Sequence, residues 1–151
     1  MNKPTEWQAG PMISQKNTDA GMKNEIISVA CAIIIYNEKI IAVQRGFKMS
    51  LPLKWEFPGG KIEKNETEEA CIKREIKEEL NIEIVLLKKL STSFYEYPNI
   101  SIELIPFVAQ YLSGDIVLKE HQSYQLLNLA ELSNLDWAEA DLPIVKELQS
   151  I

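Results

Sequence analysis

Three glutamates in the segment REIKEEL, residues 74–80, have the residue type and the spacing that bind hard divalent cations. Glu75, Glu78 and Glu79 are three or four positions apart or adjacent, so a helix would bring their side chains into one patch. Like charges at this spacing destabilise a helix by about 0.2–0.5 kcal/mol per pair. Mg²⁺ takes carboxylate oxygens from proteins while it also binds substrate phosphates. The cluster therefore predicts a magnesium site, in which the bound ion offsets the repulsion.

The composition and charge narrow the class of protein. The chain has 151 residues, 46% hydrophobic and 25% charged, which is ordinary for one globular domain. Its formal net charge is −6, so it has no basic excess with which to hold a nucleic-acid polymer directly. An acidic protein still binds a polyphosphate when divalent cations stand between its carboxylates and the phosphate oxygens. We therefore expect a small-molecule partner and no nucleic-acid partner.

The sequence does not indicate membrane or disulfide chemistry. No apolar run approaches the roughly 18–20 residues of a membrane span, so no membrane partner is expected. Cys31 and Cys71 occur without a signal-peptide pattern, which favours reduced thiols and a cytoplasmic location. His121 is the only histidine, so a His-based zinc site or a Ser-His-Asp triad has little support. Carboxylate chemistry is what remains.

The elements that must position the glutamates follow from hydrophobic patterning. A domain is expected over residues 25–151, after a polar and loosely ordered extension over residues 1–24. The pattern predicts strands over residues 26–36, 40–45, 82–97, 100–112 and 123–129. It predicts helices over 68–80 and 141–149 and a short helical turn over 130–135. This order predicts an α/β fold with a mixed sheet between helices.

Local signals delimit the helices and mark one irregular strand. Thr67 is a good N-cap for the glutamate helix, and Asn81 suits the left-handed conformation that often ends a helix. Asp141 is the expected N-cap of the last helix. Pro106 lies within the fourth predicted strand and suggests a sheet edge or a bulge there. The core stripe of the glutamate helix is Ile72, Ile76 and Leu80.

The glutamates are part of a longer pattern. Counting from Gly60 gives five residues, Glu66, seven residues and then REIKEELNI. This resembles the Nudix box, G-x5-E-x7-R-E-U-x-E-E-x-G-U with U aliphatic, and departs from it only at the last glycine, which is Asn81 here. WEFPGGKIE, residues 55–63, is similar to the entry of that motif in the MutT-like branch, and the resemblance covers residues 27–149. It implies a Nudix-like α/β/α sandwich.

The resemblance also implies roles for individual residues. The cation would be Mg²⁺, with Mn²⁺ able to substitute for it, and the ligands would be Gly59 through its carbonyl, Glu75, Glu78, Glu79 and, in the later segment KEHQ, Glu120. Arg74 would orient the carboxylates, and Glu66 would hold the loop and helix of the motif together. The proton acceptor would be Glu75 or, as second choice, Glu120. Arg45 and Lys61 would contact substrate phosphate.

The implied reaction is the hydrolysis of a nucleoside triphosphate to a monophosphate and pyrophosphate. ADLP, residues 140–143, resembles the segment that reads the base, and Asp141 there resembles the pattern of CTP pyrophosphohydrolases. A carboxylate accepts from an exocyclic amino group such as cytosine N4. Phe57, Tyr97 and Trp137 either line the base pocket or belong to the core.

Three functions stay open from the sequence. The first is a pyrophosphohydrolase leaning to cytidine or modified pyrimidine nucleotides, and the second is a MutT-like 8-oxo-dGTP diphosphatase. The third, from another class, is a non-catalytic binding or regulatory module with the Nudix fold, against which the complete REIKEEL segment argues. The sequence does not decide between a monomer and a homodimer.

Overall fold

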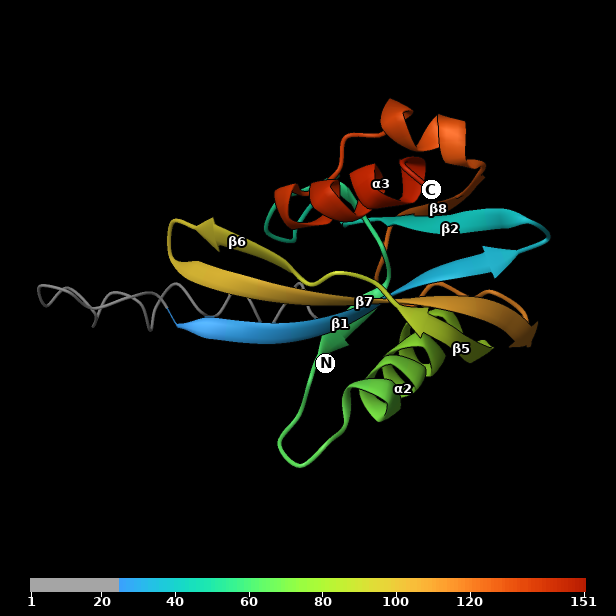
Figure 1. Cartoon of the computed structure of the whole chain (residues 1–151), viewed down its shortest axis with the longest axis horizontal. Helices are drawn as coiled ribbons and strands as arrows, with labels where there is room; N and C mark the ends of the chain where they lie inside the picture. The colour runs from blue at the N-terminus through green and yellow to red at the C-terminus, as the bar shows by residue number, and fades with distance from the viewer. Residues whose placement is uncertain (1–24) are drawn as a thin grey trace, which may run out of the picture.

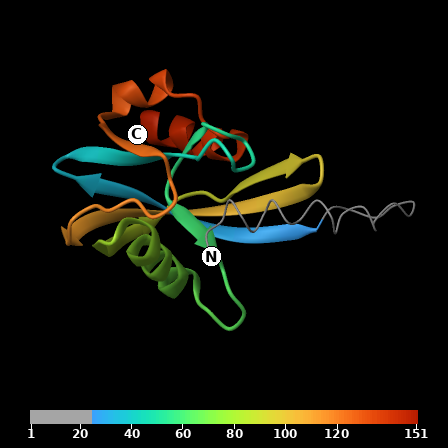
Figure 2. The same ribbon diagram turned by 180° about the vertical axis from the view of Figure 1, so that it is seen from behind.

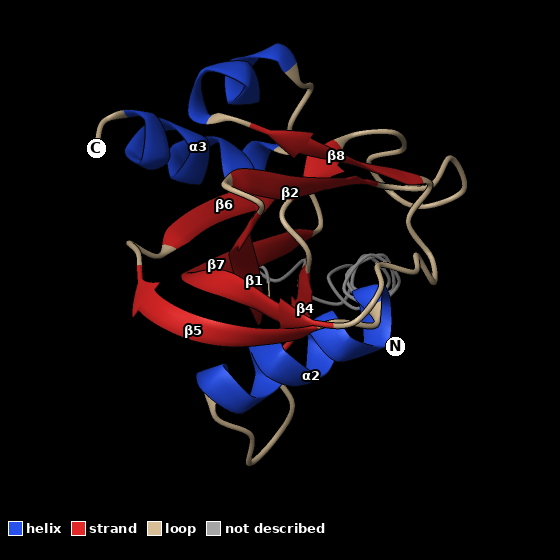
Figure 3. Cartoon of the chain, turned by 90° about the vertical axis from the view of Figure 1, so that its right-hand side faces the viewer, coloured by secondary structure: helices blue, strands red, loops and turns tan. Residues whose placement is uncertain are grey.

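The protein is a mixed β-sheet with a helical layer on each face, described here in a computed structural model over residues 25–151 (Figures 1 and 3). The predicted extension over residues 1–24 lies outside the described residues. The strands are β1 (Ile26–Tyr36), β2 (Lys39–Gln44), β3 (Trp55–Glu56), β4 (Gly59–Lys61), β5 (Glu83–Lys89), β6 (Ser93–Tyr97), β7 (Ile100–Ser113) and β8 (Ser123–Leu127). The helices are α2 (Glu68–Leu80) and α3 (Leu142–Gln149), with 3₁₀ turns η1 (Leu129–Asn134) and η2 (Glu139–Asp141).

Two long parallel strands form the centre of the sheet. β1 pairs with β7 in parallel, from Ile26 opposite Ser101 to Ile35 opposite Gln110. The other side of β1 is shared by β4 and β2, and the other side of β7 is shared by β6 and β5, all antiparallel. β3 and β8 extend the sheet from β2. The predicted α/β fold with a mixed sheet between helices is confirmed.

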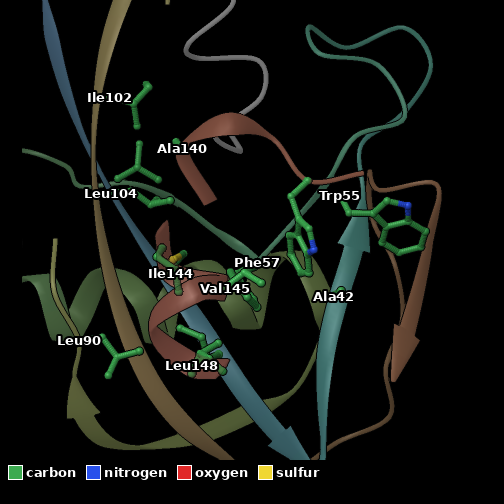
Figure 4. Close-up of a cluster of buried hydrophobic side chains, with 14 of the residues drawn as sticks. Ala42, Trp55, Phe57, Leu90, Ile102, Leu104, Ala140, Ile144, Val145 and Leu148 are labelled. Atoms are coloured by element: carbon green, nitrogen blue, oxygen red, sulfur yellow. The ribbon is translucent and has the colours of Figure 1, made fainter. Parts of the chain in front are cut away.

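The sheet has a hydrophobic core on each face because its central strands are covered on both sides. Along β1, Val29, Cys31 and Ile33 belong to the core under α3, and the alternate residues Ala30, Ala32 and Ile34 belong to the core under α2. Figure 4 shows the first core, where Ile144, Val145 and Leu148 of α3 face side chains of the sheet. The view from behind shows the same two layers on opposite faces (Figure 2). A strand buried on both faces is expected to be continuously apolar, as this one is.

The ends of α2 follow the predicted local chemistry. The Thr67 hydroxyl accepts a hydrogen bond from the Ala70 N–H at 3.0 Å, which satisfies one of the free donors of the first turn. Asn81 has φ 65° and ends the helix in the left-handed conformation. The helix runs from Glu68 to Leu80, so the prediction for this element is confirmed.

One strand prediction needs correction and another is confirmed. Residues 82–97 were expected as one strand, but they form β5 and β6, which pair one after the other along the same side of β7. Pro106 was expected at an edge or a bulge. It lies inside the sheet, beside Cys31 of β1, and on its other side residues 90–92 face only residues 105–106, which is a bulge. On the other side of β7 the β6 ladder ends at Leu104, and the β5 ladder ends at Phe107. Pro106 occupies the gap, where its missing N–H interrupts no ladder and its carbonyl accepts from the Leu90 N–H at 2.9 Å.

No helix among residues 25–151 has both the length and the apolar character needed to cross a bilayer.

Candidate active site

Helix α2 divides its three motif glutamates between the core edge and the surface. Glu75 and Glu79 are buried, with 1% and 2% of their surface exposed, although both are charged side chains. Glu78 is exposed. Burying a carboxylate is costly unless charged or hydrogen-bonding partners compensate, so two such residues one turn apart call for a cation.

Arg74 is the cation that the structure places among these carboxylates. Its Nε and Nη2 donate to the two oxygens of Glu66 at 2.6 and 2.9 Å. Its Nη1 donates to Glu75 at 2.9 Å and to Glu78 at 3.3 Å. Glu66 in turn accepts from the backbone N–H of Glu63 at 3.0 Å. Arg74 and Glu66 therefore brace the loop before α2 against the helix and fix two of the motif glutamates.

Burial and the contacts with Arg74 shift the pKa values of Glu75 and Glu66 in opposite directions. Burial raises the pKa of Glu75 to about 7, although the adjacent Arg74 acts to lower it. Hydrogen bonds from Arg74 lower the pKa of Glu66 to about 2. Glu66 is thus a fixed anion at neutral pH, and Glu75 is able to gain or lose a proton there.

Two glycines let strand β4 lie close both to β1, its neighbour in the sheet, and to α2. A Cβ on Gly59 would lie 2.0 Å from the carbonyl oxygen of Ala30 in β1. A Cβ on Gly60 would lie 2.1 Å from the carboxylate carbon of Glu75. The Glu75 carboxylate therefore sits directly over the backbone of Gly60, in a space that only glycine leaves open.

Gly60→Ala is expected to displace the Glu75 carboxylate and to lower kcat/KM by about 10-fold or more, a loss comparable to that from disturbing a metal ligand's supporting shell. The backbone should tolerate the change, because the atom met by the new Cβ is the end of a side chain. Steady-state kinetics together with a thermal melt would check this. Normal turnover in the folded variant would show that Glu75 does not need its place over Gly60.

The later segment KEHQ joins the C-terminal end of α2. The Val117 N–H donates to the Leu80 carbonyl at 3.0 Å, and the Lys119 N–H donates to the Glu79 carbonyl at 3.3 Å. These bonds satisfy two carbonyls that the helix end leaves free. Glu120, the next residue, is exposed. The structure thus brings the segment of Glu120 to the backbone of Glu79, although the two lie 41 positions apart.

The predicted phosphate contacts differ from each other in the structure. Lys61 is exposed at the end of β4. Arg45 is fully buried, and its guanidinium donates to Glu56 at 3.1 Å and to the carbonyl and hydroxyl oxygens of Ser50 at 2.7 and 2.8 Å. In this structure the charge of Arg45 pairs a buried carboxylate and holds the loop after β2, and its contact with substrate phosphate stays a prediction.

Two buried polar residues, Glu56 and His121, lie near Glu79 and were not predicted as part of the site from the sequence. Glu56 pairs with Arg45 through one oxygen, and its other oxygen lies 2.9 Å from Nε2 of His121. Nδ1 of His121 lies 4.0 Å from a carboxylate oxygen of Glu79. Both Glu56 and His121 are buried. The only signal for them in the sequence is the position of Glu56 between two aromatic residues, Trp55 and Phe57, which are usually buried.

The donor set fits a hard divalent cation. The buried Glu75 carboxylate fills the space over Gly60, and one of its oxygens has no hydrogen-bond partner. All the candidate side chains are carboxylates, which are ligands for Mg²⁺ or Mn²⁺. Among residues 25–151, no three His, Cys, Asp or Glu side chains converge closely enough to enclose an ion, and Arg74 binds both Glu75 and Glu78.

The four predicted base-binding residues come together, but inside the core. The rings of Phe57 and Trp137 pack with centroids 4.7 Å apart. The Tyr97 hydroxyl accepts from the Ala140 N–H at 3.1 Å. Asp141 precedes α3 as expected but makes no capping bond, and instead accepts from the Phe57 N–H at 2.9 Å. The predicted capping role of Asp141 is therefore wrong, because its carboxylate is directed to β3 and β4 rather than to the helix.

The fold and the site together define an α/β/α sandwich with a loop and a helix that hold carboxylates against one sheet face. The NUDIX domain family matches residues 27–148, and the chain belongs to this family. The predicted family and enzyme class are thereby confirmed: the protein is a Nudix hydrolase.

Individual relatives agree with this assignment. A CTP pyrophosphohydrolase of Escherichia coli K12 is 28% identical over 84% of this chain and 94% of its own. An 8-oxo-dGTP diphosphatase of the same organism is 32% identical over 76% of this chain and 89% of its own. The solution structure of a MutT protein of the Nudix hydrolase family from methicillin-resistant Staphylococcus aureus 252 is 41% identical, with a TM-score of 0.70 over 85% of this chain and 98% of its own.

Proposed function

We propose that the protein is a Mg²⁺-dependent pyrophosphohydrolase, which cleaves nucleoside triphosphates with water to a monophosphate and pyrophosphate. Nudix enzymes act on small nucleotides, and both relatives described above carry names of nucleotide hydrolases. The observation that carries the proposal is the complete glutamate set of α2. Glu75 and Glu79 are buried there, and the Glu75 carboxylate lies over Gly60 with one oxygen free of hydrogen bonds.

Cation binding, carboxylate positioning and phosphate binding would fall to different residues of the site. A cation held by Glu75, Glu78, Glu79, Glu120 and the Gly59 carbonyl would lower the pKa of the attacking water and neutralise charge on the phosphate oxygens. Mn²⁺ would substitute for Mg²⁺, because it accepts the same oxygen ligands. Arg74 would keep the carboxylates in place, and the exposed Lys61 would contact a phosphate.

Glu75 is the preferred proton acceptor. A general base works best when its pKa is near the operating pH, and the pKa of Glu75 is raised to about 7. Glu120 is the second choice, because its segment is held at the end of α2 and its side chain is exposed.

For the base we favour cytidine or modified pyrimidine nucleotides. An ionised Asp141 only accepts hydrogen bonds, which suits the amino group at cytosine N4. One relative is named a CTP pyrophosphohydrolase. The alternative is 8-oxo-dGTP, because a carboxylate also accepts from the N1–H and the amino group of an oxidised guanine, and another relative is named an 8-oxo-dGTP diphosphatase. Phe57, Tyr97 and Trp137 are assigned to the packed core that carries Asp141.

The test is pyrophosphate release with Mg²⁺ across CTP, dCTP, 5-methyl-dCTP, dGTP, 8-oxo-dGTP and a nucleotide sugar. We expect the highest kcat/KM within the cytidine set. A preference for 8-oxo-dGTP would move the protein to the guanine-sanitising alternative. If none of these nucleotides is hydrolysed and the protein also fails to bind Mn²⁺, a non-catalytic module is favoured. The intact glutamates of α2 argue against that outcome.

A further inference from the structure

The backbone between β3 and the last helix contains a short parallel ladder that a side chain extends. The Trp55 N–H donates to the Asp136 carbonyl at 2.9 Å, and the Ala138 N–H donates to the Trp55 carbonyl at 2.9 Å. In a parallel ladder the Phe57 N–H would come next and would donate to the Ala138 carbonyl. That carbonyl instead accepts from the Asp141 N–H at 3.0 Å, within the turn η2.

Asp141 supplies the acceptor that the ladder lacks. Its carboxylate oxygen Oδ2 accepts from the Phe57 N–H at 2.9 Å, although 84 positions separate the two residues in sequence. The side chain of Asp141 is 2% exposed, so water does not compete for this bond. A bond between a backbone N–H and an ionised carboxylate is among the stronger hydrogen bonds of proteins.

The residue before Asp141 is held on both of its backbone groups. The Ala140 N–H donates to the Tyr97 hydroxyl at 3.1 Å, and the Ala140 carbonyl accepts from the Ser93 hydroxyl at 2.8 Å. Ser93 and Tyr97 are the first and last residues of β6 and lie on one face of it, and both are buried. Strand β6 therefore fixes where η2 places the Asp141 carboxylate.

The segment that Asp141 holds leads directly into the proposed metal site. Only Pro58 separates Phe57 from Gly59, and the Pro58 carbonyl accepts from the Ala32 N–H of β1 at 2.9 Å. Gly59 is packed against β1, and Gly60 lies under the carboxylate of Glu75. The position of Phe57 therefore restricts where the Gly59 carbonyl lies, because only a few soft torsions separate the two residues.

We propose that Asp141 is a positioning residue for the metal loop, with Ser93 and Tyr97 holding it in place. The base side and the metal side of the site are then coupled through the bond from Phe57 to Asp141. This inference rests on the proposed function, since it takes the Gly59 carbonyl as a metal ligand and Asp141 as the residue near the base. By linkage, a nucleotide that engages Asp141 changes the affinity of the loop for its cation, and the cation changes nucleotide affinity by the same factor.

The decisive comparison is between Asp141→Asn and Asp141→Leu. Asparagine keeps an amide oxygen that accepts from the Phe57 N–H, and leucine has the same branched shape without an acceptor. Mn²⁺ binding to the nucleotide-free protein, followed by electron paramagnetic resonance, is independent of turnover. We expect D141N to bind Mn²⁺ within about twofold of the wild type and D141L to bind it about 10-fold or more weakly, as when a supporting residue of a metal site is lost.

The control is Leu148→Ala, which removes a buried side chain of α3 outside the contacts of Asp141. It should lower the melting temperature without changing the dissociation constant for Mn²⁺. If D141L fails to fold, the double variant Ser93→Ala, Tyr97→Phe takes its place, because it removes the two hydroxyls that hold Ala140. This double variant should also bind Mn²⁺ more weakly than L148A.

The outcomes separate this inference from the proposed function. Absence of Mn²⁺ binding by the wild type would show that the proposed metal site is wrong. Wild-type affinity in a folded D141L, or in the Ser93 and Tyr97 double variant should D141L fail to fold, would overturn the positioning role while leaving the metal site intact. A D141N variant that keeps its Mn²⁺ affinity and changes the order of kcat/KM across the nucleotide panel would show both roles of Asp141 at once.

Discussion

Replacing Glu79 with glutamine is expected to lower kcat with Mg²⁺ by more than about 100-fold while the protein stays folded. Disturbing the support of a metal ligand costs about 10- to 100-fold, so removing the charge of a ligand itself should cost more. Glu79 is 2% exposed, and its backbone carbonyl accepts from the Lys119 N–H. Water or a neighbouring side chain therefore has little room to take the place of its carboxylate at the cation. Glutamine has the same shape, which keeps the packing of α2.

The measurement is the steady-state rate as a function of Mg²⁺ concentration, with a thermal melt of each variant. Glu69→Gln on the exposed side of the first turn of α2 is the matched control, because it makes the same chemical change outside the site. We expect E69Q to turn over at the wild-type rate. Near-normal turnover by E79Q would show that Glu79 is not a ligand of the catalytic cation.

The parts of the site that the sequence predicted are those built from neighbours along one helix. The ends of α2 depend on Thr67 and Asn81, whose effects are local, and the glutamate patch depends only on helical spacing. Arg74 and Glu66 are eight positions apart and meet across the first two turns of α2, because Glu66 directly precedes the N-cap Thr67. A fixed motif captures such contacts, since its spacing carries the geometry.

The parts that the sequence did not predict depend on contacts between distant segments. His121 meets Glu56 across 65 positions, and Asp141 meets Phe57 across 84. The sequence predicted a phosphate contact for Arg45 but not its burial, and Glu56 and Ser50 bind its guanidinium inside the protein. The division of residues 82–97 into β5 and β6 likewise follows from Pro106 in the partner strand, which local patterning of those residues does not contain.

The raised pKa of Glu75 predicts that the metal-free protein loses stability as the pH rises toward 7. The folded protein holds the proton of Glu75 up to a pKa of about 7, whereas the ordinary value is 4.5. This contribution to the free energy of unfolding is therefore fully present below pH 4.5 and is lost as the pH rises through 7. At 1.36 kcal/mol per pKa unit, the loss from this one group reaches about 3 kcal/mol.

Urea unfolding in EDTA between pH 5 and pH 8, on the wild type and on Glu75→Gln, would measure this loss. Glutamine cannot ionise, so E75Q should become more stable relative to the wild type as the pH rises across this range. Glu66 does not disturb the comparison, because its pKa is lowered to about 2 and its contribution is lost only as the pH falls through that value. Parallel curves for the two proteins would contradict the raised pKa.

A divalent cation should reverse the loss of stability that the wild type shows as the pH rises. The cation binds the ionised carboxylate, so it competes with the proton and stabilises the protein more at pH 8 than at pH 6. The burial that makes ionised Glu75 costly in the metal-free protein then serves the reaction, since the carboxylate oxygen that Arg74 does not bind gains a partner when the ion is bound. If Mg²⁺ stabilised E75Q as much as the wild type at pH 8, the ion would have to bind without this carboxylate.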